Sequence, residues 1–333
     1  MKHVAAPLVA LVLLLSACAS PPPSRPDWIA GDSASYKSAQ YLLGRGQAAT
    51  PEEAQDRARA DLSKIFQVAV SADSEDVQKF KSGAAGGEYE SQATRRISTR
   101  TEQIIRGIQI AQLWQDPDTR NHHALAVLPR LQTAAALRQQ IAQLDEATGK
   151  QIEQSRASDD LFLKIAAASR ALQTQQERAG VQKSLQVVDI TGRGIASPWN
   201  SAALQGDLDG LLKRVRIAPQ LAVDAPAALA QMVSGALAHA GFLIETAPNP
   251  DFLLQAKLEL ADLGLQQGWY WQRGTLEISL AEKASGRVRG TRSWPIKANA
   301  QDRDSAARRA LTQADTVLKQ ELRSAIIEMA TTR

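Results

Sequence analysis

Cysteine and histidine are scarce in this sequence, which limits the thiol and metal chemistry open to it. Cys18 is the only cysteine among 333 residues, and there are four histidines. A disulfide within the chain is therefore excluded, and a zinc site is not expected, because zinc is usually held by thiolates and imidazoles. His122 and His123 are adjacent, so on a strand they point to opposite faces, and His239 stands alone late in an expected helix.

A strong excess of one charge and the common catalytic motifs are also missing. Lysine and arginine number 39 against 35 acidic residues, and the basic residues are scattered, so nucleic acid is not expected as a partner. No GxSxG motif occurs, and the Gly192-x-Gly194 pair lacks the GK[ST] ending of a phosphate-binding loop. We therefore expect no cofactor and no small-molecule substrate, and we interpret the segment around these glycines as a flexible connector.

Long apolar runs are absent except for one near the start, at residues 4–15. A membrane-spanning helix needs about 20 apolar residues, so this run is too short to cross a bilayer. It follows a short basic start, Met1-Lys2-His3, and this order is typical of a secretory signal peptide. We predict a signal peptide over residues 1–17.

The end of this run, Leu15-Ser16-Ala17-Cys18, resembles the lipobox of bacterial lipoproteins. The resemblance implies that Cys18 is diacylated, becomes the new N-terminus and attaches the protein to a membrane. Ala19-Ser20 follows Cys18 in place of the aspartate that retains such proteins in the inner membrane, which favours the periplasmic face of the outer membrane. A plain signal peptide with a chance cysteine is the alternative.

Residues 18–26 contain four prolines and are predicted to form an extended tether. At about 3.1 Å per residue in a polyproline-like conformation, the tether reaches about 30 Å at most. The first folded domain should therefore lie close to the membrane that holds Cys18.

Residues 27–130 predict an α+β domain. Thr50, Pro51 and Glu53 form a capping box that starts a helix. The expected inward face of this helix consists of Ala54, Ala58, Leu62, Ile65 and Phe66. The other expected elements are a short strand at 41–44 interrupted by Gly44 and Gly46, a strand at 66–72, a helix at 89–105, and a hairpin of strands at 108–114 and 123–128. Pro129 should end pairing of the last strand.

This arrangement resembles the LPP-twenty lipoproteins, a family named from a small outer-membrane antigen. The matching features are Trp28, the Gly44-x-Gly46 pair, the segment EEAQDRARADLSKIFQVAVSA at 52–72, Trp114 with its acidic turn, and residues 124–128 followed by Arg130. The domain is also similar to the N-terminal part of the flagellar assembly protein T family. The resemblance implies a periplasmic α+β module without known catalytic residues.

Residues 131–187 are rich in alanine, glutamine and leucine and predict a helical hairpin, with Ser158 as the cap of its second helix. The hairpin either closes the first domain, which we favour, or forms a free coiled coil that recruits a partner. Residues 188–333 predict a second α+β domain, in which a helix from Asp224 to Ala240, three antiparallel strands and a helix at 303–329 follow one another. We expect Ala307, Leu311, Ala314, Leu318, Leu322 and Ile326 to form the inward stripe of the last helix.

The alternation of apolar and polar residues around Leu276 places Tyr270 on the inner face of its strand and Trp269 and Trp271 on the outer face, beside Arg273. Exposed tryptophan with arginine is a candidate partner-binding site, because these residues anchor many interfaces. A bulge at Gly274 would instead reverse the phase and bury both tryptophans.

The sequence therefore predicts two small α+β domains separated by a helical hairpin, behind a signal peptide. The function it favours is that of a non-catalytic lipoprotein which binds an envelope protein partner in cell-wall synthesis, flagellar or secretion machinery. The alternative is a periplasmic cell-wall-modifying or hydrolytic enzyme with an unrecognised site.

Overall fold

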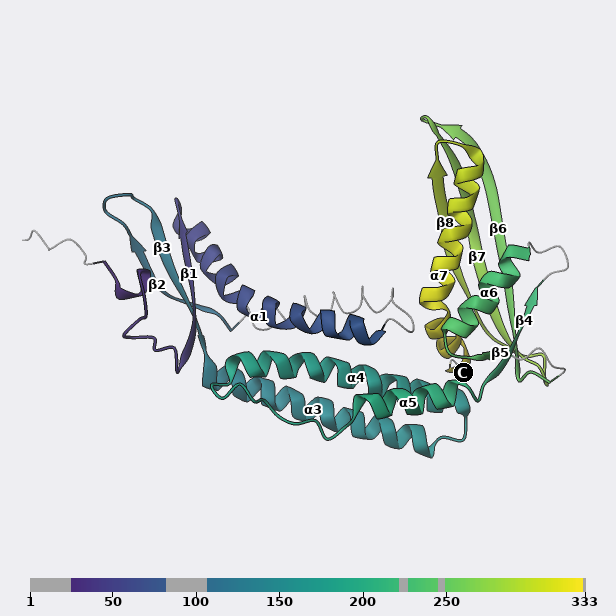
Figure 1. The fold of residues 1–333 in the computed structure, drawn as a ribbon, viewed down its shortest axis with the longest axis horizontal. Coiled ribbons are helices and arrows are strands. Elements are labelled where there is room, and N and C mark those ends of the chain that lie inside the picture. Colours follow the sequence, from purple (N-terminus) through teal and green to yellow (C-terminus); the bar gives the residue numbers. More distant parts are fainter. Residues whose placement is uncertain (1–24, 82–106, 222–226, 245–248, 332–333) are drawn as a thin grey trace, which may run out of the picture. The chain divides into compact units, whose positions relative to one another are not determined.

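The computed structural model describes residues 25–81, 107–221, 227–244 and 249–331, with the backbone alone for residues 67–81 and 227. The signal peptide, Cys18, the helix expected at 89–105 and Asp224 lie outside the described residues. The chain forms two compact units, Met1–Leu62 with Ile108–Pro129, and Ser63–Gly107 with Arg130–Arg333. Each combines helices with a sheet, so the predicted α+β class is confirmed (Figure 1).

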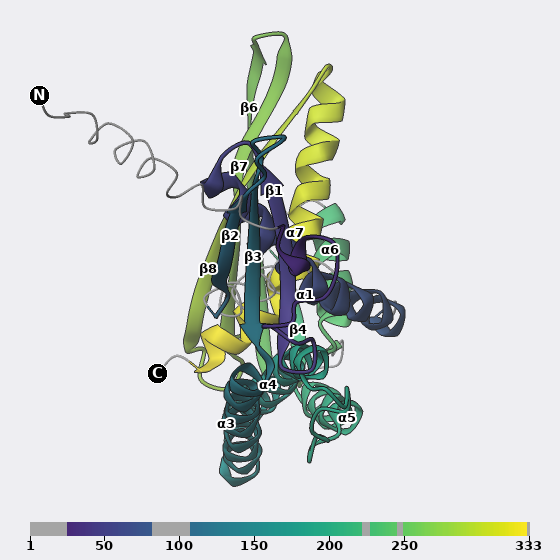
Figure 2. The same cartoon turned by 90° about the vertical axis from the view of Figure 1, so that its left-hand side faces the viewer.

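The first unit is built on a three-stranded antiparallel sheet. Its strands are β1 (Tyr41–Ala48), β2 (Gln109–Gln115) and β3 (His122–Pro129), and β3 lies between the other two (Figure 2). The hairpin expected from the sequence is thus confirmed. Pro129 pairs with Tyr41 as the last residue of the ladder, as its missing N–H predicts.

Strand β1 runs unbroken through the two glycines that were expected to interrupt it. A Cβ atom at Gly44 would lie 2.3 Å from the carbonyl oxygen of Ala58, and one at Gly46 would lie 2.0 Å from that of Ala54. Both alanines belong to helix α1 (Pro51–Lys81). The glycines therefore let a helix backbone pack directly on the strand.

Helix α1 begins as predicted, because the Glu53 N–H donates to the Thr50 hydroxyl oxygen at 3.3 Å. The strand expected at 66–72 is wrong, since the helix continues to Lys81. No proline or glycine interrupts this segment, and a short apolar alternation does not separate strand from helix. Ile65 is exposed, whereas the other four expected inward residues are buried.

The opposite face of the first sheet is covered by the N-terminal segment. A short 3-10 helix, Asp27–Ile29, places the buried Trp28 against Leu125 and Val127 of β3. Arg45 on β1 fixes this segment, since its Nε donates to the Trp28 carbonyl at 2.6 Å and its Nη2 donates to the Gly31 carbonyl. The folded domain thus begins immediately after the predicted tether.

The second unit contains the predicted helical hairpin, formed by α3 (Arg130–Ala157) and α4 (Leu161–Val188). The cap of α4 is Asp160 in place of the expected Ser158, because the Asp160 carboxylate accepts hydrogen bonds from the N–H groups of Phe162 and Leu163. Phe162 and Ile165 belong to the core of the C-terminal sheet. The hairpin, expected to close the first domain, is therefore part of the C-terminal core.

The C-terminal sheet has five strands in the order β5-β4-β6-β7-β8. Their bounds are β4 (Arg216–Leu221), β5 (Leu243–Ile244), β6 (Phe252–Gln266), β7 (Trp269–Glu282) and β8 (Val288–Ala300). The three long strands pair antiparallel as expected, but β4 is parallel to both of its neighbours, so the sheet is mixed. Pro219 lies within β4, beyond the two residues that pair with β5, and stays in register with Leu254 of β6.

Three helices complete this unit: α5 (Ser201–Leu212), α6 (Ala227–His239) and α7 (Arg303–Thr331). Helices α6 and α7 lie on one face of the sheet (Figure 1). The buried stripe of α7 starts at Ala306 and Ala310, not at Ala307 and Leu311, and then follows the prediction from Ala314 to Ile326. The helices leave the other face of the sheet open.

Candidate partner-binding surface

The β6–β7 hairpin brings the three predicted partner-binding residues to the open face of the C-terminal sheet. The even-numbered residues of β7 lie on the face that the helices cover: Gln272, Leu276, Ile278 and Leu280 are buried, and Tyr270 is half-buried. Trp269, Trp271 and Arg273 occupy the opposite phase: Trp269 is 41% exposed, Trp271 is half-buried and Arg273 is exposed. The outward phase expected from the sequence is therefore correct.

The bulge considered at Gly274 does not form. Gly274 stays in register with Leu260 on one side and Ile296 on the other. A Cβ atom at Gly274 would lie 1.8 Å from the carbonyl oxygen of Glu259, so the glycine permits close approach of the two strands. The register shift occurs on β6, between Asp262 and Gly264.

Charged residues also lie on the open face of the sheet. Lys257 and Glu259 of β6 form an exposed ion pair with a nitrogen–oxygen distance of 2.5 Å. Arg273 of β7 stands directly opposite Lys297 of β8, and both are exposed. Like charges in facing positions disfavour each other, so this pair does not stabilise the sheet.

The free edge of β8 is protected against pairing with another strand. The Lys297 N–H donates to Gln313 of α7 at 2.9 Å, and Arg309 of α7 donates to the Asn299 carbonyl at 2.7 Å. Pro295 lies two residues before Lys297 on this edge and has no N–H to offer. This edge is therefore poorly suited to pairing with another strand.

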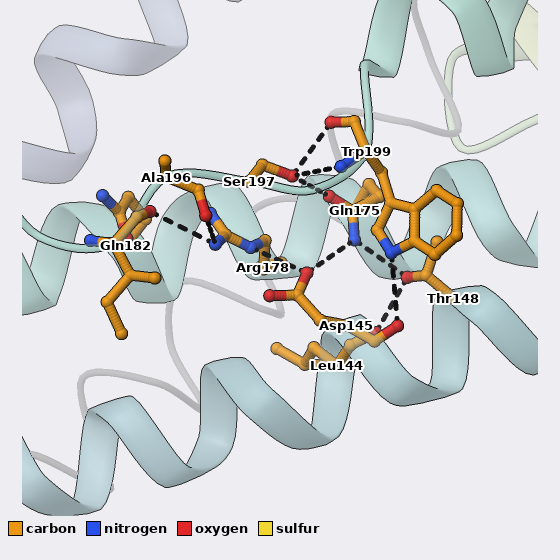
Figure 3. A network of polar contacts seen from close by, with 10 residues as sticks. Leu144, Asp145, Thr148, Gln175, Arg178, Gln182, Ala196, Ser197 and Trp199 are labelled. Carbon is orange, nitrogen blue, oxygen red and sulfur yellow. Dashed lines mark hydrogen bonds and ion pairs between the residues drawn. The ribbon is translucent and has the colours of Figure 1, made fainter.

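A buried polar network holds the segment that was expected to be a flexible connector (Figure 3). Arg178 of α4 is paired with Asp145 of α3 at 3.0 Å, and its Nη2 donates to the carbonyls of Ile195 and Ala196 at 3.2 and 2.9 Å. Gln175 contacts Asp145, Thr148 and Ser197, and the Trp199 indole N–H donates to the Asp145 carbonyl. Because the polar groups contact one another, the network fixes the connector to the hairpin and needs no ligand.

Carboxyl groups with shifted pKa values have ordinary structural explanations. Hydrogen bonds from the Arg216 side chain lower the pKa of Asp251, and a hydrogen bond from the Asp118 backbone lowers that of Asp116. Both shifts favour the ionised form, whereas a general acid working at neutral pH needs a raised pKa. The enzyme alternative thus gains no support from these groups and stays a prediction.

The hollow beside Asp116 is shallow and open to solvent. Its lining consists of Leu113, Trp114, Gln115, Asp116, Pro117 and Arg120. In the part of the chain that the structure describes, no three metal-ligating side chains come together. Within the same described ranges, no helix is long and apolar enough to cross a membrane.

The N-terminal third of the chain is similar to a known protein family. Residues 26–129 match the LPP20 lipoprotein family. The LPP20 resemblance, which the sequence placed at 27–130, is thereby confirmed. The similarity to flagellar assembly protein T is not confirmed by these findings and stays a prediction.

Solved structures provide only distant likenesses to this chain. A secreted protein of Helicobacter pylori is 8% identical, with a TM-score of 0.42, and the alignment covers 85% of this chain and 97% of that one. A minor lipoprotein of Acinetobacter baumannii is 10% identical (TM-score 0.26; 36% and 90% covered), and rare lipoprotein B of Shewanella oneidensis is 15% identical (TM-score 0.24; 34% and 98% covered). No curated protein matches the chain.

Proposed function

We propose that this lipoprotein is a non-catalytic, outer-membrane module that faces the periplasm and binds a protein partner of the cell envelope. The LPP20 match over residues 26–129 supports a lipoprotein. The position of Cys18 after Leu15-Ser16-Ala17 supports attachment through lipid on that residue, and Ala19-Ser20 supports the outer membrane.

The observation that carries the binding role is the open face of the C-terminal sheet. Trp269, Trp271 and Arg273 share one phase of β7 on that face, and no described helix covers them. Large aromatic side chains and arginine contribute most of the binding energy in many interfaces. Since the β8 edge is shielded, the face itself is the surface that a folded partner would use.

Substituting Cys18 tests the anchor. We expect Cys18→Ser to remain an unprocessed precursor without acyl chains, because the hydroxyl cannot take the place of the thiol that is acylated. Metabolic labelling with a radioactive fatty acid measures this directly, with Ser20→Ala as a matched control that should label normally. Undiminished labelling of Cys18→Ser would refute lipid attachment at this residue.

Substitutions of Trp271 and Arg273 on the open face of the C-terminal sheet test the proposed partner surface. Some proteins are expected to co-purify with the unaltered lipoprotein from detergent-solubilised envelopes. The double variant Trp271→Ser with Arg273→Glu should no longer co-purify with them. Each substituted side chain points away from the core, so the change in unfolding free energy should stay below about 1 kcal/mol. Val288→Ser, an exposed change at the opposite end of the sheet, is the control and should keep the partners.

The same co-purified proteins with the double variant and with the unaltered chain would contradict this assignment of the surface. A large fall in melting temperature would show instead that Trp271 is part of the core. Thermal unfolding of both variants therefore accompanies the co-purification.

A further inference from the structure

The tip of the β6–β7 hairpin is an uncharged, apolar end of the C-terminal sheet. Residues 263–272, with the sequence LGLQQGWYWQ, contain no charged side chain. Three of the nine large apolar side chains that are exposed in the described part of the chain lie here: Leu263 at 43%, Leu265 at 60% and Trp269 at 41%. We call residues 263–272 the hairpin tip.

The shape of the hairpin tip follows from a tight turn and a bulge. Gln267 and Gly268 both have positive φ angles, 52° and 81°, as in the type I′ turns that join two-residue hairpins. Leu263 is the extra residue of the register shift on β6. Leu265 lies opposite Tyr270, while Trp269 lies opposite Gln266 in the other phase, so apolar side chains project on both sides of the tip.

Apolar side chains on both sides are poorly suited to a flat protein surface, which covers one side of a hairpin. They are well suited to insertion of the tip end-on, where lipid surrounds both sides. Trp269, Tyr270 and Trp271 follow one another, and tryptophan and tyrosine are the residues enriched at the membrane–water interface. The tip also projects past the turn between β8 and α7 (Figure 2).

The charges at the base of the hairpin tip fit an anionic surface. Asp262, the acidic residue directly before the tip, is paired with Arg303 at 2.8 Å. Arg273 and Lys297 face each other just beyond the other end of the tip, and among the described residues neither forms an ion pair. Arg273 lies five positions after the turn residue Gly268, about 17 Å along a strand.

We propose that the hairpin tip inserts into the surface of a bilayer that contains anionic lipids. Insertion by the 5–10 Å that is typical of interfacial segments would bring the turn, Leu265 and Trp269 to the boundary of the acyl chains. Arg273 and Lys297 would then stand within about one Debye length of the headgroups. This contact is additional to the lipid on Cys18, and it shares Trp269 and Arg273 with the partner surface proposed above.

The test uses a chain that starts at Arg25 and so carries no acyl group. Every buried side chain described here lies at Trp28 or later, so this chain keeps both cores. We expect it to sediment with vesicles of equal parts phosphatidylcholine and phosphatidylglycerol, less with phosphatidylcholine alone, and less at high salt. Leu263→Ser with Leu265→Ser should lower the partition coefficient about tenfold or more, while Val288→Ser should leave it unchanged.

The proposal is overturned if the unaltered chain does not bind, if the leucine variant binds as well as the unaltered chain, or if neutral vesicles bind equally well. If the unaltered chain does not bind vesicles and the leucine variant loses its co-purifying proteins, the tip is a protein interface instead. The leucine variant retains Trp271 and Arg273, so failure here and failure of the proposed partner surface are separate results.

Discussion

Gly46→Ala should destabilise the first unit by about 3 kcal/mol, the upper part of the range for overpacked sites. The new Cβ atom would lie 2.0 Å from the Ala54 carbonyl oxygen and 2.4 Å from the Ala58 nitrogen. Both atoms belong to the backbone of α1, so no side-chain rotation relieves the clash and the helix must move away from β1. Ala54, Ala58 and Leu62, all completely buried against this sheet, would lose their packing.

Thermal unfolding followed by tryptophan fluorescence measures the effect, because Trp28 and Trp114 lie in the first unit. For a domain of this size, about 3 kcal/mol corresponds to a melting temperature lowered by roughly 12–24 °C. Gly31→Ala is the matched control, since a Cβ atom there meets nothing within 4 Å. Equal melting temperatures for the two variants would show that α1 does not rest on Gly46.

The two glycines show how a local pattern predicts the wrong structure for a good reason. Glycine usually weakens a strand, so Gly44 and Gly46 were expected to interrupt one. Their role depends on α1, which follows later in the chain and packs directly on the strand. The role of Arg178 could not be predicted for a similar reason. Its carbonyl partners at 195 and 196 lie 17 and 18 residues later in the chain, so they give no local signal.

Other elements could be predicted where the pattern was long. On β7 the alternation runs over the six residues 275–280, and its phase, extended back to residue 269, placed Trp269, Trp271 and Arg273 on the correct face. The strand expected at 66–72 rested on four residues and was wrong, because α1 continues through it. Strands β4 and β5 and helix α5 were missed, since β5 has two residues and β4 contains a proline.

The features of the hairpin tip and of its charged base could be predicted from the sequence only in part. The absence of charge from 263 to 272 can be read directly from the sequence. The exposure of Leu263 and Leu265 could not be predicted, because the register shift on β6 changes which face each residue occupies. The facing of Arg273 and Lys297 likewise required the register between β7 and β8.

Substituting one partner of the Asp145–Arg178 ion pair should lower the stability of the helical hairpin more than substituting an exposed ion pair. The Arg178 side chain is 4% exposed and that of Asp145 is 19% exposed. Arg178→Met keeps much of the side-chain volume but leaves the Asp145 carboxylate and two carbonyls without their strongest donor. Removing one partner of a buried pair typically costs 3–5 kcal/mol, and since Asp145 retains some solvent contact we expect about 3 kcal/mol.

In a unit of this length, that loss corresponds to a melting temperature lowered by roughly 6–12 °C. Glu146→Ala is a matched control on the neighbouring residue of α3. Glu146 is also paired, with Lys150 at 2.6 Å, but both side chains are about two-thirds exposed, so its loss should leave the melting temperature unchanged. If the two substitutions lowered the melting temperature equally, burial would not make the Asp145–Arg178 pair more stabilising than the exposed pair.

Adding Asp145→Asn to Arg178→Met should recover part of the lost stability, because the unpaired charge is then removed from the interior. The carbonyls of Ile195 and Ala196 still lack their donor, so recovery should be incomplete. The difference between the double variant and the sum of the single variants measures the coupling within the pair. If that coupling is absent, the connector is held by Gln175, Gln182 and Trp199, and Arg178 serves only to fill space.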